Sequence, residues 1–115
     1  MIIKIENLRL RTIVGIYEWE KKTKQHIVIN VEIEFDGTRA IETDNIEDTI
    51  DYKTITKKII AMVEGGEFNL IERIAGEAMK IVIENEKVEK ASVRVDKPGA
   101  LRFTDTVSVT QTQMR

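Results

Sequence analysis

Four polar residues in this sequence could move protons without the help of a metal ion. They stand at the ends of otherwise apolar segments: Glu72 in FNLIER, Tyr52 in DTIDYKT, Lys97 in VRVDKPGA and Glu20 in GIYEWE. Carboxylates, a phenol and an amine act as general acids and bases when a fold brings them to one place. The combination therefore predicts proton-transfer chemistry, although no single member of the set is diagnostic.

Each of these residues also has a structural interpretation. Glu72 lies three residues after Asn69, which is the spacing of a capping box, and the spacing alone favours that role. Lys97 before Pro98-Gly99 is typical of a solvated strand end, and the ring of Tyr52 is expected to pack with its hydroxyl in water. Alternatively, a carboxylate beside the free N–H groups of a helix N-terminus could bind the planar edge of a pterin or guanine ring.

The composition argues against several other classes of site. The chain has no cysteine, and its single histidine, His26, has no neighbouring ligand residues, so neither thiolate chemistry nor a metal site is expected. The formal charge of -2 gives no general attraction to nucleic acid or to an anionic membrane. Because no run of about 18 apolar residues could span a bilayer, we expect a soluble, cytoplasmic protein.

Alternating apolar and polar residues predict two strands in the first third of the chain. Residues 27–35 alternate strictly, which is typical of a half-buried strand. The opening segment also alternates, but its phase changes near Glu6-Asn7, which predicts a β-bulge or bend. The two strands are expected to form a long hairpin joined around residues 19–23.

Two helices and two further strands are predicted downstream. Apolar spacing predicts helices over residues 50–63 and about 70–84, and Gly65-Gly66 ends the first of them. Strand-like segments follow around 93–95 and 107–109. This order predicts an α+β fold with a four-stranded antiparallel sheet and two helices on one face.

Placed in order, these segments make the chain similar to the dihydroneopterin aldolase family, which includes dihydroneopterin triphosphate 2′-epimerase. The resemblance covers nearly all of residues 1–115 as one domain and lies in ENLRLRTIVGIYEWE, DNIEDTIDYKTITKKI, VEGGEFNLIERIA and VRVDKPGALRFTDTVSV. ENLRLRT and ALRFTDTVSVT resemble the epimerase branch, whereas GIYEWE resembles bacterial aldolases. The resemblance implies the tunnelling fold (T-fold), in which four copies form a barrel that can stack into a homo-octamer.

The resemblance also implies how a pterin substrate would be held. Glu72 would accept the hydrogens of the 2-amino group and N3 of the ring. Main chain near four residues would hold other ring edges: Leu70, Ile71, Ile50 and Asp51. The site would lie between subunits, with Tyr52 from one chain and Glu72 with Lys97 from its neighbour.

The implied reaction needs no cofactor. Protons would be donated and accepted by Glu20, Tyr52 and Lys97. Meanwhile the C1′–C2′ bond of dihydroneopterin breaks and the ring takes up the electrons. Release of glycolaldehyde gives 6-hydroxymethyl-7,8-dihydropterin, and re-addition to the other face gives the 2′-epimer. Two alternatives stay open, a protein that is principally the aldolase of folate biosynthesis and a non-catalytic oligomeric pterin-binding scaffold.

A phosphorylated side chain would need a cation near the site. We predict that Arg102, with Arg9 or Arg11, contacts phosphate, because a guanidinium binds phosphate oxygens bidentately. A solvated strand arginine is the structural alternative for each of them. The expected partners are a small pterin substrate and further copies of the chain, with no nucleic acid and no membrane.

Overall fold

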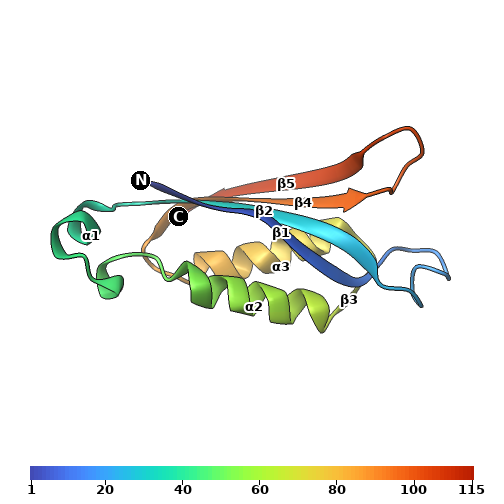
Figure 1. Cartoon of the computed structure of the whole chain (residues 1–115), viewed down its shortest axis with the longest axis horizontal. Helices are drawn as coiled ribbons and strands as arrows, with labels where there is room; N and C mark the ends of the chain where they lie inside the picture. The colour runs from blue at the N-terminus through green and yellow to red at the C-terminus, as the bar shows by residue number, and fades with distance from the viewer.

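A long antiparallel hairpin opens the fold in the computed structural model, which describes residues 1–115 (Figure 1). Strand β1, Ile2–Val14, pairs with β2, Gln25–Phe35, and the register shifts between Ile5 and Leu8. Asn7 has a left-handed φ of 55°, and its backbone N–H donates to the side-chain oxygen of Asn30 at 2.9 Å. The bulge predicted near Glu6-Asn7 is confirmed.

Two C-terminal strands complete the antiparallel sheet. Strand β4, Val88–Pro98, pairs with β2, and β5, Thr106–Met114, pairs with β4. A two-residue strand, β3, Glu67–Phe68, pairs in parallel with the end of β1, so the sheet order is β3-β1-β2-β4-β5. The four predicted strands are confirmed, and β3 is an addition, because two residues are too few to show an alternating pattern.

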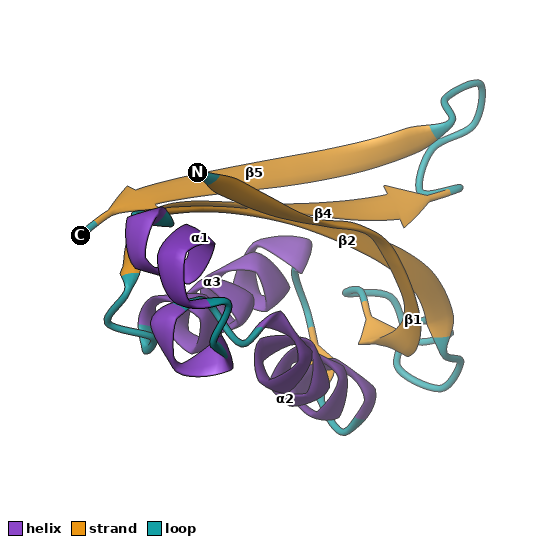
Figure 2. Cartoon of the chain, turned by 60° about the vertical axis from the view of Figure 1, so that its left-hand side comes forward, coloured by secondary structure: helices purple, strands orange, loops and turns teal.

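Two helices cover one face of this sheet (Figure 2). Helix α2, Tyr52–Glu64, lies against β1, and α3, Ile71–Ile83, lies against β4 and β5. Their bounds agree with the predicted ranges to within two residues. The structure has no helix that is both long enough and apolar enough to cross a bilayer.

The acidic segment between β2 and α2, for which the sequence pattern predicted no helix, contains short helical turns. These are α1, Thr38–Thr43, and the 3-10 helix η1, Ile46–Asp48, and neither has a buried residue. The side chains of Arg39 and Thr43 both donate to Asp48 and hold the segment together. Without a buried face, these turns leave no periodic apolar signal in the sequence.

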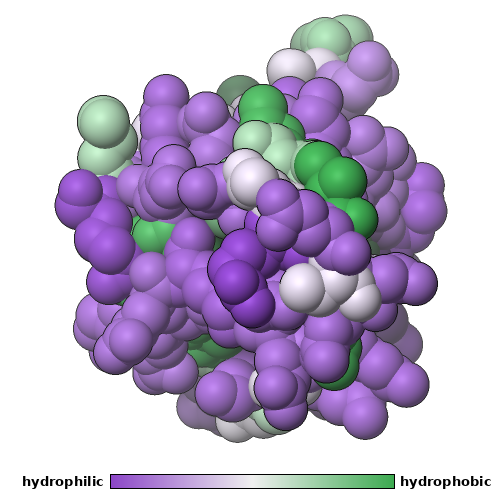
Figure 3. Space-filling view, turned by 90° about the vertical axis from the view of Figure 1, so that its left-hand side faces the viewer, coloured by the Kyte–Doolittle hydropathy of each residue, from purple (hydrophilic) through white to green (hydrophobic).

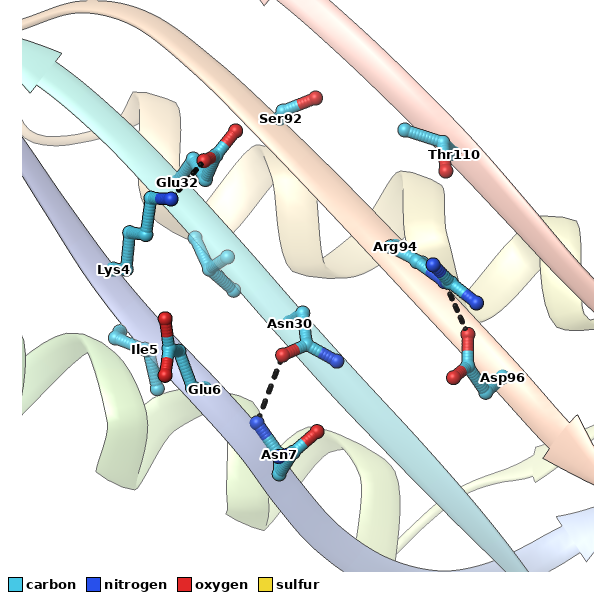
Figure 4. A pocket seen from close by; sticks show the side chains of 11 residues that line it. Lys4, Ile5, Glu6, Asn7, Asn30, Glu32, Ser92, Arg94, Asp96 and Thr110 are labelled. Carbon is cyan, nitrogen blue, oxygen red and sulfur yellow. Dashed lines mark hydrogen bonds and ion pairs between the residues drawn. The ribbon is translucent and has the colours of Figure 1, made fainter.

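The two faces of the sheet differ in character. Ile27, Ile29 and Ile33 of β2 are fully buried under the helices. The opposite face is polar and has a shallow depression of about 490 Å³ where β1, β2, β4 and β5 lie side by side, with the ion pair of Lys4 and Glu32 at one end (Figure 4). The end of the molecule that carries α1 is also mostly hydrophilic, with scattered apolar groups (Figure 3).

Candidate active site

The alternation of β4 determines where Lys97 lies. Ala91, Val93 and Val95 form the buried row of this strand, under α3. Because side chains alternate with a period of two, Lys97 continues the same row at the point where the strand leaves the core. Its side chain is 15% exposed, so the solvated strand end that the sequence alone favoured is wrong.

Lys97 forms an ion pair with Glu20, whose side chain is 6% exposed. The distance between Nζ of Lys97 and Oε2 of Glu20 is 2.6 Å. Glu20 also accepts hydrogen bonds from the side-chain amide of Gln25 at 3.1 Å and from the backbone N–H of Tyr17 at 3.2 Å. The hydrogen bond from Lys97, supported by the other two donors, lowers the pKa of Glu20 from 4.5 to about 2, against the opposing effect of burial. The pair is therefore a fixed carboxylate that orients an ammonium group.

Gly15 makes room for this carboxylate. Its φ of +142° is unfavourable for residues with a side chain, and a Cβ at this position would lie 2.1 Å from Cδ of Glu20. The backbone N–H of Gly15 also donates to the carbonyl oxygen of Phe68 in β3 at 3.0 Å. The short strand β3 thus joins the loop that carries Glu20 to the segment that leads into α3.

Helix α3 begins without a side-chain cap. Its N-cap is Leu70, in an extended conformation, and no side chain caps the first turn. The capping box predicted from Asn69 and Glu72 is therefore wrong, because the helix begins one residue later than that motif requires. Glu72 is exposed in the first turn, beside backbone N–H groups that have no partner within the helix. This is the arrangement that the ring-binding interpretation requires.

Two adjacent pockets meet at Lys97. One, of about 290 Å³, is lined by Glu72, Ile71 and apolar side chains of β1 and β5. The other, of about 300 Å³, is lined by Glu20 and by Tyr17 and Trp19 of the β1–β2 loop. Four residues line both pockets: Asn69, Leu70, Lys97 and Ala100. The first pocket therefore has the Glu72 carboxylate among apolar walls, and the second contains the Glu20–Lys97 ion pair.

The other predicted contributors lie at the far end of α2. Tyr52 is its first residue and is 56% exposed, so the packed ring expected from the sequence is wrong for a single chain. Asp51 caps the helix by accepting the backbone N–H of Thr54 at 3.1 Å, and this bond lowers the pKa of Asp51. Ile50 is buried.

The helices themselves separate these residues from Glu72. Helix α2 has 13 residues and therefore spans about 20 Å. It starts beside the α1 segment, whereas α3 starts at the opposite end of the helical layer, next to β3 (Figure 1). One chain thus brings Glu20, Lys97, Leu70, Ile71 and Glu72 together but leaves out the Tyr52 end.

The three predicted phosphate-binding arginines are also dispersed. Arg102 lies in the turn between β4 and β5, exposed, with its guanidinium 5.6 Å from the ring centre of Phe103. Arg9 and Arg11 alternate with the inward-facing Leu10, so they lie on the polar face of the sheet, away from both pockets.

Sequence reasoning missed Gln25 and Gly15. Gln25 donates from one amide nitrogen to Glu20 and to the carbonyl oxygen of Val14, at 3.1 and 2.7 Å. A signal was present, because Gln25 occupies the same row of β2 as the buried Ile27 and Ile29. A polar residue on an inward row is expected to have a specific partner.

Comparison with known proteins gives consistent similarities. A family model described as FolB, dihydroneopterin aldolase, matches residues 3–112. A dihydroneopterin triphosphate 2′-epimerase of Pseudomonas aeruginosa is 46% identical over 108 residues, which cover 94% of this chain and 88% of the relative. A dihydroneopterin aldolase of Escherichia coli is 31% identical, with the same coverage.

A solved structure extends the similarity to the fold. Escherichia coli dihydroneopterin aldolase in complex with neopterin matches with a TM-score of 0.93 and 29% identity, over 98% of each chain. The α+β architecture expected for a protomer of the tunnelling fold is therefore confirmed. The greater similarity to the epimerase than to the aldolase also agrees with the motif comparison.

Proposed function

Because the chain belongs to the dihydroneopterin aldolase family, we propose that it catalyses reversible retro-aldol chemistry on the side chain of a dihydroneopterin. The principal reaction is 2′-epimerisation of 7,8-dihydroneopterin triphosphate, accompanied by cleavage of dihydroneopterin to 6-hydroxymethyl-7,8-dihydropterin and glycolaldehyde. The preference for epimerisation is supported by 46% identity to an epimerase against 31% to an aldolase. The observation that carries the chemistry is the buried Glu20–Lys97 pair beside the pocket of Glu72.

Ring binding is assigned to the start of α3. Glu72 accepts the 2-amino and N3 hydrogens of the pterin, and main chain near Leu70 and Ile71 donates to the remaining edge. Main chain near Ile50 and Asp51 of a neighbouring chain holds the opposite edge. The apolar walls of the 290 Å³ pocket cover the flat faces of the ring.

Proton transfer is assigned to Lys97, Tyr52 and Glu20. The 2′-hydroxyl loses its proton, the C1′–C2′ bond breaks, and the electron pair moves into the N5=C6 imine to give an enamine. Protonation at C1′ gives the hydroxymethyl product, whereas re-addition of the aldehyde through its other face gives the epimer. Glu20, whose pKa is lowered to about 2, holds the side chain of Lys97 by a hydrogen bond and directs it at the reacting oxygens.

A product assay tests this function. Dihydroneopterin and its triphosphate are incubated separately with the protein, and epimer, hydroxymethyl product and glycolaldehyde are resolved by chromatography. Epimer from the triphosphate is the expected main product. Cleavage alone would favour the aldolase of folate biosynthesis, and pterin binding without any product would favour the scaffold.

We further propose that the complete site forms between copies of this single domain, residues 1–115, in a cytoplasmic tetramer or octamer. Support comes from the position of Tyr52, which lies at the end of the helical layer opposite to the start of α3 (Figure 1). It also comes from the sheet edges, since most of β1 and all of β5 lack a partner on their outer sides. Unpaired edges of this length are suited to pairing with another chain.

Subunit complementation tests the shared site. Tyr52→Phe and Lys97→Ala variants, each inactive alone, are unfolded together and refolded as mixed assemblies. If each site takes Tyr52 from one chain and Lys97 from the next, about a quarter of the sites in a random mixture are intact. Activity restored toward that fraction supports the arrangement, and a mixture as inactive as its components contradicts it.

A further inference from the structure

The loop between β1 and β2 carries three lysines whose ammonium groups have no acidic partner in the structure. Lys21, Lys22 and Lys24 are exposed, and none of them forms an ion pair. They fall within four positions of a chain whose formal charge is -2. Of the two acids in this loop, Glu20 is already neutralised by Lys97, so only Glu18 offsets this local positive charge.

The same loop forms a wall of the second pocket. Hydrogen bonds from the backbone N–H groups of Glu20 and Lys21 to the carbonyl oxygen of Tyr17, at 3.0 and 3.2 Å, fold residues 17–21 into a helical turn. Tyr17, Trp19 and Glu20 of this turn line the pocket, and the lysines follow directly. Lys21, Lys22 and Lys24 do not line the pocket themselves but belong to the loop that forms its wall.

The geometry of the two pockets gives the direction of a bound substrate. A ring held by Glu72 fills the first pocket, and Lys97 lies at the junction where the C1′–C2′ bond must be placed. The side chain beyond that bond then enters the second pocket and ends toward the loop. The far end of the side chain is where a 3′-phosphate chain is attached.

We propose that Lys21, Lys22 and Lys24 form a polyphosphate subsite that selects the triphosphate substrate over dihydroneopterin. The inference rests on the proposed function, because it takes the ring to be bound at Glu72. Arg102 contributes from the β4–β5 turn, whose Gly99 and Ala100 line the same pocket from the other side. Ammonium and guanidinium groups bind phosphate oxygens through charge-assisted hydrogen bonds.

The test compares substrate preference among three variants. One is Lys21→Gln/Lys22→Gln/Lys24→Gln, the second is Arg102→Ala, and the third is a control with the same change in charge, Lys57→Gln/Lys80→Gln/Lys87→Gln. The control lysines are exposed and line neither pocket. The measured quantity is the ratio of kcat/KM for dihydroneopterin triphosphate to kcat/KM for dihydroneopterin, which a general loss of folded protein leaves unchanged.

The loop variant is expected to lower this ratio by about 30-fold or more, because each charge-assisted contact contributes about tenfold to affinity in favourable geometry. Arg102→Ala should lower it by about fivefold, and the control variant should leave it within twofold. Added salt should reduce the preference of the unmodified protein, since exposed charges are screened. A loop variant that keeps the original ratio would overturn the proposal.

A binding measurement separates this inference from the proposed function. Inorganic tripolyphosphate is titrated calorimetrically into the unmodified protein, the loop variant and the control variant. Binding that only the loop variant loses supports the subsite even if neither pterin is turned over. Turnover of both pterins combined with equal tripolyphosphate binding by all three proteins refutes the subsite and leaves the proposed function intact.

Discussion

Replacing Lys97 with methionine should expose how strongly the fold depends on the Glu20–Lys97 pair. The substitution keeps the length of the side chain but leaves the Glu20 carboxylate, 6% exposed, without its cation. Two hydrogen bonds to Glu20 remain, from Gln25 and Tyr17. A lowering of the pKa from 4.5 to about 2 corresponds to about 3 kcal/mol in favour of the charged form.

Lys97 is the largest contributor to that lowering, so its loss should cost about 2 kcal/mol of unfolding free energy at pH 7. A double-mutant cycle with Glu20→Gln isolates the pair. The double variant leaves no unpaired charge. Its loss of unfolding free energy should therefore be smaller than the sum of the losses of the two single variants, by about 1.5 kcal/mol or more. Urea unfolding followed by circular dichroism at fixed protein concentration provides the four free energies.

The surface pair of Lys58 and Glu84 is a matched control. Its atoms are 3.6 Å apart and its side chains are 57% and 65% exposed, so its coupling should be below about 0.5 kcal/mol. If the Glu20–Lys97 coupling is no larger than this, the ion pair does not hold the site together. Both single variants should also lose at least about a hundredfold in kcat, as expected for groups that position or transfer protons.

Three further results are expected. Gly15→Ala should destabilise the protein by about 2 kcal/mol or more in urea unfolding, and by more than Gly99→Ala, because only a Cβ at Gly15 meets Glu20. Because folding lowers the pKa of Glu20, the stability that its carboxylate contributes should be fully present above about pH 4.5 and should be lost as the pH falls toward 2. In acid unfolding experiments, Glu20→Gln should remove this part of the pH dependence. Glu72→Gln should weaken neopterin binding at least tenfold in a fluorescence titration without changing the melting temperature, since Glu72 is exposed and caps nothing; unchanged affinity would remove its assigned role.

The parts of the fold that bury apolar side chains were predictable. The alternation along β2 and the helical spacing of α2 and α3 reflect burial against one another, and the phase change in β1 marked a real bulge. The same logic explains the misses. The α1 and η1 turns have no buried residue, and β3 is only two residues long. None of these three elements therefore leaves a periodic apolar pattern in the sequence.

The candidate site was predictable only in part, for a different reason. Residue types and motif resemblance pointed to Glu20 and Lys97 separately, but the bond between them joins positions 77 residues apart. Such a contact depends on the register of β4 and on the conformation at Gly15, which local spacing does not encode. The start of α3 was misplaced by one residue for a similar reason, since β3 pairing keeps the chain extended up to Leu70.

The exposure of Tyr52 links the architecture to the proposed assembly. Tyr52, the first residue of α2, is 56% exposed, whereas Ile50, two residues earlier, is buried. Leu70, at the opposite end of the helical layer, is likewise 51% exposed beside the Glu72 pocket. Two exposed apolar groups at the two ends of one layer are suited to meeting in a head-to-tail contact between copies. We infer that each chain supplies half of two sites, because Tyr52 and Glu72 stand at the starts of α2 and α3, at opposite ends of the helical layer, and α2 alone spans about 20 Å.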